Sequence, residues 1–226
     1  MSAYNLVNMF QDVVTEHSRL MGIDTPTMQL SSEGFWAVTK HKMKIHRAPG
    51  LYETVSAETW PEKPGPVRGG RNFLIKDSGG NVIVESRSEW VILDMADHHI
   101  RKISDTIYPI TDEHIDKRLL PDPFLRIKET VCPDDYVYTH IVRPSDIDLS
   151  QHTNNAVYVR LFEDCFPLSF FEENRVGSIE INYANESKIG AEILLYKKPL
   201  PEGYYIQASS PEGKIYAFCK LETVKR

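Results

Sequence analysis

The sequence contains few cysteines, no long apolar run and no excess of positive charge, and each of these absences excludes a class of protein. Its three cysteines, Cys132, Cys165 and Cys219, are odd in number and widely spaced, so they predict neither a disulfide framework nor a zinc site. We therefore expect a reducing, cytoplasmic location and no bound metal or other cofactor.

No segment approaches the roughly 20 apolar residues that a membrane-spanning helix needs. The opening residues, Met1-Ser2-Ala3-Tyr4-Asn5, do not combine a basic segment with an apolar core, so neither export nor membrane insertion is expected. The formal net charge of -6 disfavours nucleic acid as a partner, because a protein that follows a phosphate backbone normally presents a basic face. An acidic protein partner would have to meet a local basic patch.

Periodic patterns divide the first half into a helix followed by strands. Apolar residues recur at steps of three and four between residues 5 and 22, which predicts an amphipathic helix that Gly22 closes. Alternating or β-branched runs then predict strands at 36–45, 52–60, 72–76 and 82–93. Residues 97–135 contain four spaced prolines and predict a linker with one short helix around 112–119.

The second half repeats this order after an additional strand. A strand at 136–142 leads through a polar turn to an amphipathic helix at 154–166, which Pro167 stops. Four further strands are predicted at 176–186, 191–197, 204–209 and 215–224. We therefore expect an α+β fold of two units, 1–96 and 136–226, each an antiparallel sheet wrapped around a central helix.

Three landmarks support an internal repeat. Phe10-Gln11-Asp12 matches Phe162-Glu163-Asp164 at an offset of 152, Gly50 matches Gly190, and Gly80 matches Gly213, all in the same order. The same offset aligns Met1 with Thr153, so nothing in the first half corresponds to residues 136–152. We expect the first unit to lack its leading strand, and any chemistry of the polar turn to occur once per chain.

The polar turn at 143–155 is the most unusual segment, because it lies just before a predicted helix whose first N–H groups can polarise a carbonyl. Asp148 could act there as a general base. Alternatively Asp148, Ser150 or Asn154 caps the helix or closes an Asx turn, which is the more common outcome for such a segment. The helix dipole would keep His152 neutral, although a lone histidine is more often a surface or packing residue.

Other candidates stand out less. Glu186 ends a predicted strand, and alternation places it on the solvent side unless a bulge turns it. His46 precedes Gly50 by four residues, as Glu186 precedes Gly190, so it is a candidate counterpart in the first unit. Cys165 lies in an apolar helix pattern, where a small core residue is more common than a nucleophile.

Several of these residues together resemble the acyl-acyl-carrier-protein thioesterases of bacteria and plant plastids. The resemblance covers nearly the whole chain and depends on the order of its motifs. In the first half these are Phe10-Gln11-Asp12, Gly34 to Trp36, Arg47-Ala48-Pro49, Thr59-Trp60-Pro61, Arg71-Asn72-Phe73 and Ser88-Glu89-Trp90-Val91. In the second half they are Arg143-Pro144-Ser145-Asp146-Ile147-Asp148, His152-Thr153-Asn154-Asn155, Tyr158 and Glu186.

The resemblance implies a double hotdog fold and hydrolysis of acyl carrier protein thioesters to free fatty acids. It implies a catalytic set of Asp148, His152 and Glu186 with Ser150, where the family usually has Asn. It places Asn154 and Asn155 at the substrate. Ser187 stands at a position where plant members of the family carry a cysteine. The implied partner is acyl carrier protein with its phosphopantetheine-linked acyl chain, and the implied state is a monomer or homodimer.

Three alternatives stay open at this point. An acyl-CoA thioesterase of the same fold would use the same chemistry on another thiol carrier. A hotdog hydratase or dehydratase also uses an acidic residue and a histidine, although the spacing of Asp148 and His152 disfavours it. A non-catalytic acyl-binding protein is compatible with Ser150 in place of Asn.

Overall fold

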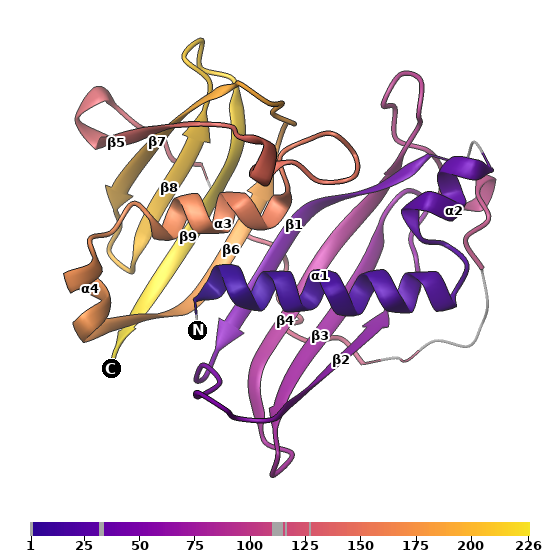
Figure 1. Ribbon diagram of the computed structural model, residues 1–226, viewed down its shortest axis with the longest axis horizontal. Coiled ribbons are helices and arrows are strands. Elements are labelled where there is room, and N and C mark those ends of the chain that lie inside the picture. The colour runs from indigo at the N-terminus through magenta and orange to yellow at the C-terminus, as the bar shows by residue number, and fades with distance from the viewer. Residues whose placement is uncertain (1, 32–33, 110–114, 116, 127) are drawn as a thin grey trace. The chain divides into compact units, whose positions relative to one another are not determined.

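The computed structural model describes residues 2–31, 34–109, 115, 117–126 and 128–226 (Figure 1). The chain divides into two compact units. The first unit consists of residues 8–122, and the second consists of residues 1–7 with residues 123–226. The boundaries predicted above, with a linker at 97–135, remain predictions, and the helix predicted around 112–119 falls largely outside the described residues.

The first unit is a four-stranded antiparallel sheet with helices beside it. Helix α1 (Ala3–Leu20), which enters this unit at residue 8, and the short α2 (Thr25–Leu30) precede all four strands. The strands are β1 (Phe35–Ile45), β2 (Val55–Pro61), β3 (Gly69–Asp77) and β4 (Val82–Leu93), and they pair in the order β2-β3-β4-β1. A 3-10 turn, η1, follows at Ile103–Asp105.

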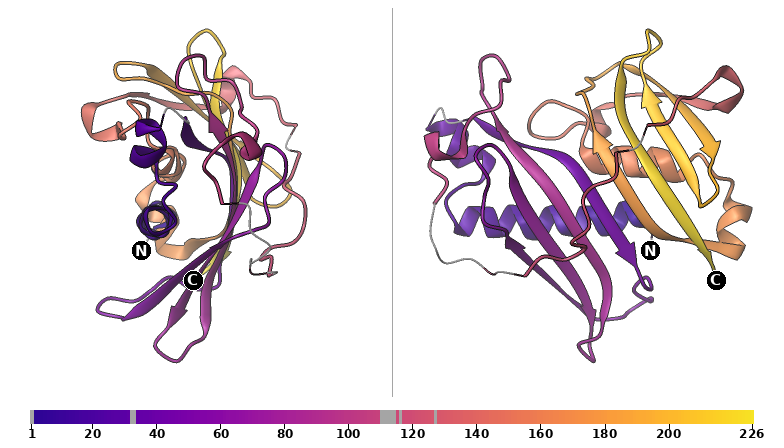
Figure 2. Two further views of the ribbon diagram at one scale, coloured as in Figure 1. Left: turned by 90° about the vertical axis from the view of Figure 1, so that its right-hand side faces the viewer. Right: turned by 180° about the vertical axis from the view of Figure 1, so that it is seen from behind.

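The core of the first unit lies between α1 and the sheet. The ring of Phe10 on α1 lies 4.9 Å from that of Phe73 on β3, and both side chains are buried. Met43, Ile75 and Val84 are buried on the neighbouring strands. The apolar stripe that predicted α1 is therefore the face that packs on the sheet. Figure 2 shows α1 end-on beside the strands.

The second unit has five strands around α3 (Asn155–Glu163). Its strands are β5 (Tyr136–Ile141), β6 (Asn174–Tyr183), β7 (Glu192–Pro199), β8 (Tyr204–Ser209) and β9 (Ile215–Lys225), antiparallel in the order β5-β7-β8-β9-β6. The shorter elements are η2 (Pro133–Asp135), η3 (Pro144–Asp146) and α4 (Leu168–Glu173). Val159 and Phe162 of α3 are fully buried, and so is Ile206 of β8, because the helix lies along the inner face of this sheet.

The two units repeat one plan, a helix followed by four strands. The repeat landmarks occupy equivalent turns, since Gly80 lies between β3 and β4 with φ 80° and Gly213 lies between β8 and β9 with φ 85°. Gly50 and Gly190 lie in the loops that follow β1 and β6. No described strand precedes α1, whereas β5 precedes α3. The predicted α+β plan of two helix-and-sheet units is confirmed.

Among the described residues, none of the helices combines the length and the apolar composition that crossing a bilayer requires. Within the same residues no group of three or more His, Cys, Asp or Glu side chains is arranged to hold a metal ion. Cys165 and Cys219 are buried free thiols, and Cys132 is an exposed one.

Candidate active site

Two loops of the second unit bring His152 and Glu186 together. The first loop, residues 147–154, precedes α3, and the second, residues 184–191, follows β6. His152 Nε2 lies 3.0 Å from Glu186 Oε2, although 34 residues separate them along the chain, and the two side chains are 13% and 35% exposed. The histidine is thus mostly buried against a carboxylate that solvent can still reach.

A cluster of buried hydroxyl groups joins these loops directly beside the pair. Thr153 N donates to Ser187 O over 2.9 Å, and Ser187 Oγ lies 2.7 Å from both Thr153 Oγ1 and Tyr158 OH. Thr153 and Ser187 follow His152 and Glu186 in the chain, so the hydroxyl contacts set the spacing of the pair. No periodic pattern in the sequence points to Ser187. The family resemblance singles it out only because plant members carry a cysteine at this position.

Alternation placed Glu186 on the solvent side of a strand unless the backbone departed from the regular ladder, and the structure shows such a departure. Strand β6 ends at Tyr183, and the next two amides, Ala184 N and Asn185 N, both donate to Tyr216 O at 2.8 and 3.1 Å. Because two successive amides share one carbonyl, the chain leaves the ladder and strict alternation ends there. Glu186 therefore belongs to a loop and turns toward His152.

Asp148 lies on the same turn as His152, within electrostatic reach of the pair. Its Oδ1 accepts Ser150 N at 2.8 Å, and its backbone N donates to His152 O at 3.0 Å. Burial raises the pKa of the Asp148 carboxyl, the backbone N–H groups of Ser150 and His152 oppose that rise, and the charge of Glu186 adds to it. A partly buried carboxyl with a raised pKa beside a histidine is typical of acid–base sites.

Both structural roles considered for this segment are present as well. Asn154 is the N-cap of α3, with its Oδ1 accepting Ala156 N at 2.8 Å, and Asp148 closes an Asx turn on Ser150. Asn155 is the first residue of α3, and its carbonyl accepts Tyr183 OH at 3.3 Å. The predicted substrate contacts of Asn154 and Asn155 and the predicted role of Ser150 stay predictions.

Cys165 and His46 are not part of this site. Burial raises the pKa of the Cys165 thiol to about 12, and its Sγ donates to Leu161 O at 3.4 Å, as expected of a core residue. His46 Nε2 pairs with Glu85 Oε2 at 2.9 Å on exposed surface.

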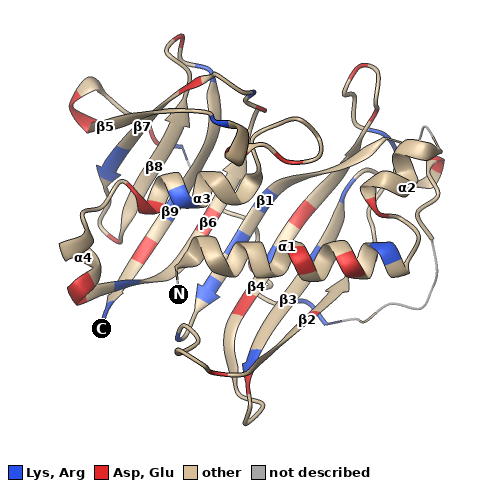
Figure 3. Ribbon diagram, in the orientation of Figure 1, with Lys and Arg blue, Asp and Glu red and all other residues tan. Residues whose placement is uncertain are grey.

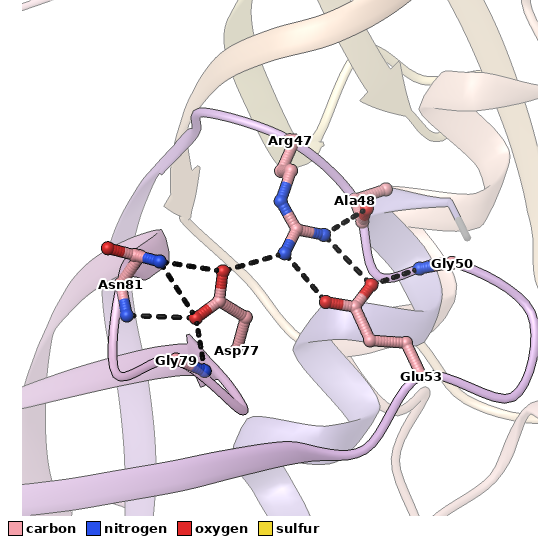
Figure 4. Close-up of polar contacts among 7 residues, drawn as sticks. All are labelled: Arg47, Ala48, Gly50, Glu53, Asp77, Gly79 and Asn81. Carbon is pink, nitrogen blue, oxygen red and sulfur yellow. Dashed lines mark hydrogen bonds and ion pairs between the residues drawn. The ribbon is translucent and has the colours of Figure 1, made fainter.

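The first unit carries a different polar network in the loop that follows β1. Arg47 contacts Glu53 at 2.6 Å and Asp77 at 3.0 Å, which ties this loop to the turn between β3 and β4 (Figure 4). Asp77 Oδ1 in turn accepts the amides of Gly79 and Asn81 at 3.0 and 2.9 Å. The corresponding position of the repeat therefore holds an ion-pair network around Arg47, next to the His46–Glu85 pair.

Comparisons with known proteins agree with the sequence motifs. The family models named acyl-ACP thioesterase N-terminal domain and acyl-ACP thioesterase C-terminal domain match residues 1–111 and 134–216. The chain is 25% identical over 197 residues to a chloroplastic acyl-[acyl-carrier-protein] hydrolase of Cuphea viscosissima, covering 83% of this chain and 48% of the relative. It thus spans about half the length of the curated relatives it matches.

Solved structures match over nearly the whole chain. An acyl-ACP thioesterase from Bacteroides thetaiotaomicron superimposes with a TM-score of 0.84 at 23% identity, covering 99% of this chain and 90% of that one. The 12:0-ACP thioesterase from Umbellularia californica gives a TM-score of 0.87 at 20% identity, covering 100% and 91%. At these identities the matches establish the fold, two tandem hotdog units, as predicted.

Proposed function

Because the chain belongs to the acyl-ACP thioesterase family, we propose that it hydrolyses thioesters between fatty acyl chains and acyl carrier protein. The products are the free fatty acid and the carrier with its phosphopantetheine thiol. The observation that carries the proposal is the pairing of His152 with Glu186 beside the partly buried carboxyl of Asp148. Relatives named as acyl-ACP hydrolases and thioesterases support the choice of substrate.

In the proposed reaction Asp148 is the general base. A base works best when its pKa is close to the working pH, and burial moves the pKa of Asp148 in that direction. Asp148 takes a proton from a water molecule as the water oxygen bonds to the thioester carbon. Ser150, held on the same turn by its N–H bond to Asp148, helps to orient that water.

The His152–Glu186 pair completes the reaction on the leaving group. Glu186 holds the imidazole through Nε2, and His152 donates a proton to the sulfur as the carbon–sulfur bond breaks. Solvent then carries the proton on Asp148 back to His152, which balances the cycle.

The start of α3 is proposed to meet the charge that develops on the carbonyl oxygen. Asn154 accepts Ala156 N with its side chain and Val157 N with its carbonyl oxygen at 2.8 and 2.9 Å, so these two amides are engaged in the cap. We assign the polarisation of the thioester carbonyl to the helix dipole and the N–H of Asn155, the first residue of α3.

The carrier protein requires a docking surface on a chain whose net charge is -6. Figure 3 shows Lys and Arg interspersed with Asp and Glu along the elements of the second unit. The exposed Arg143 lies just before η3, and the exposed Lys188 lies on the second site loop. Hydrogen bonds of 3.0 Å between Val142 and residues 190–191 hold these two segments together. We propose these two cations as the contact for an acidic carrier. A cytoplasmic location and a monomeric or homodimeric state complete the proposal.

Purified protein incubated with acyl carriers over a series of chain lengths tests this function, with the released acid identified by mass spectrometry. We expect free fatty acid, loss of product with His152→Ala, and no hydration of enoyl thioesters. Binding of acyl carriers without release of acid would refute hydrolysis and favour an acyl-binding protein.

A further inference from the structure

Asp146 is the most enclosed carboxylate near the site, and neither the mechanism above nor the sequence motifs give it a role. It lies two residues before Asp148 and is 2% exposed. Its Oδ2 accepts His140 Nε2 at 2.8 Å and Arg143 N at 2.8 Å, and its Oδ1 accepts Arg160 Nη2 at 2.6 Å. Three donors thus converge on one buried side chain.

These donors come from three different parts of the second unit. His140 lies on β5, Arg143 begins the turn η3, and Arg160 lies near the middle of α3. The backbone of Asp146 adds a fourth connection, since its carbonyl accepts Asn154 N, the N-cap of α3, at 2.8 Å. One residue therefore connects the strand before the site loop, the turn, and the helix after it.

The loop that carries the proposed catalytic residues is closed at its base by this arrangement. The Asp146–Asn154 hydrogen bond joins its two ends, and the Asp148–His152 hydrogen bond of 3.0 Å lies one step inside. Ile147 and Thr153 pair between them as an isolated antiparallel bridge. The placement of Asp148 and His152 therefore depends on how firmly the base of the loop is held to β5 and α3.

We infer that Asp146 is a positioning residue, whose carboxylate fixes loop 147–154 to β5 and α3 so that Asp148 and His152 keep their working geometry. This inference rests on the proposed function for its effect on turnover. Its structural part, the fixing of the loop, stands on the contacts alone.

The Asp146 carboxylate keeps its charge although it is buried, because the polar and charged groups around it offset the cost of burial. Burial by itself would raise the pKa of Asp146, but the N–H of Arg143, the imidazole of His140 and the charge of Arg160 together hold the pKa below its ordinary value. The carboxylate therefore stays ionised at neutral pH. Replacing it by an amide leaves Arg160, whose Nε is buried without a partner, short of its counter-ion.

Asp146→Asn tests the inference, with Asp164→Asn as the matched control because Asp164 is exposed at the other end of α3. A displacement of about 1 Å in a catalytic group can cost roughly 10²-fold in rate. We expect kcat on an acyl carrier to fall by about that factor with KM little changed, and the control to match the wild type. Unchanged kcat in folded Asp146→Asn would overturn the inference.

A second variant separates positioning from stability. Asp146→Asn with Arg160→Gln removes both charges, so we expect thermal stability to recover relative to Asp146→Asn while kcat stays low. Recovery of kcat in step with stability would overturn the positioning role. Should Asp146→Asn not fold, Arg160→Gln alone removes one of the three donors to the Asp146 carboxylate and should still lower kcat.

Hydrogen–deuterium exchange makes the test independent of the reaction. In Asp146→Asn we expect the amides of residues 147–154 to exchange faster than in the wild type and in Asp164→Asn. Unchanged exchange there would overturn the inference even in an active enzyme. A wild type without thioesterase activity would refute the proposed function, while faster exchange in the variant would still support the fixing of the loop.

Discussion

Asp148→Asn separates a catalytic role for this residue from a purely structural one. The carboxylate closes an Asx turn by accepting Ser150 N at 2.8 Å, and the amide oxygen of Asn can accept the same hydrogen bond. The replacement therefore preserves the turn and removes only the charge and the ability to take a proton. A residue that merely closed the turn would tolerate this change.

We expect Asp148→Asn to lower the rate of turnover and to raise the stability of the folded protein at neutral pH. Loss of a general base typically costs 10²–10⁴-fold, so we expect kcat to fall by about that factor, which is roughly 3–5 kcal/mol of barrier. Because burial raises the pKa of Asp148, the folded protein carries an unfavourable charge once the pH exceeds the folded-state pKa. Below the unfolded value of about 3.9 both states are protonated and this penalty is absent.

The assay is turnover of an acyl carrier together with thermal unfolding from pH 4 to pH 8. Asp148→Asn should unfold at the same temperature as the wild type at about pH 4 and at a higher temperature at about pH 8, while its turnover is low throughout. Asp134→Asn, at an exposed carboxylate of η2, should change neither quantity. Retained turnover with a lower unfolding temperature would refute the catalytic assignment and show that Asp148 acts as a turn residue.

Three further changes test other parts of the site and fold. Glu186→Gln should lower kcat by about 10²-fold or more because the partner of the proposed catalytic imidazole loses its charge, whereas the exposed Glu192→Gln should be neutral; similar rates for both would contradict the pair. Ser187→Ala removes the hydroxyl that contacts both Thr153 Oγ1 and Tyr158 OH, and should reduce the free energy of unfolding by about 1–3 kcal/mol in urea titrations; an unchanged midpoint would contradict the cluster. Hydrogen bonds from Arg47 hold the pKa of Glu53 at about 2 against an ordinary 4.5, so their stabilisation is present above pH 4.5 and disappears toward pH 2. Arg47→Met should therefore lower the unfolding temperature above pH 4.5 and match the wild type near pH 2, and a difference that persists at pH 2 would contradict this.

Strands whose sequences show alternating or β-branched runs bounded by turn residues were predictable from the sequence. The predicted limits of β4 and β8, 82–93 and 204–209, are those of the structure. Helices α2 and α4 were not predicted, because each spans only six residues and cannot display a helical period. The start of α2 is set by a local N-cap, in which the side chain of Asp24 accepts a hydrogen bond from Thr27 N. Only a search for N-cap residues in the sequence would find it.

The site was predictable only in part. Asp148 and His152 share one turn, so their proximity follows from their spacing. The place of Glu186 does not, because it depends on Tyr216 O on β9, which takes two amides and ends β6 early. The hydroxyl cluster around Ser187 and the contacts of Asp146 join residues distant in sequence, and no period or motif encodes them.

The most direct test of the proposed function compares one acyl group on two carriers. The same fatty acyl chain is presented as the acyl carrier protein thioester and as the coenzyme A thioester, and kcat/KM is measured for each, with Arg143→Glu/Lys188→Glu as the docking variant. We predict a higher kcat/KM on the carrier protein, and a preference that this variant reduces by raising KM. Equal or better turnover of the coenzyme A thioester would contradict the account and assign the site to an acyl-CoA thioesterase.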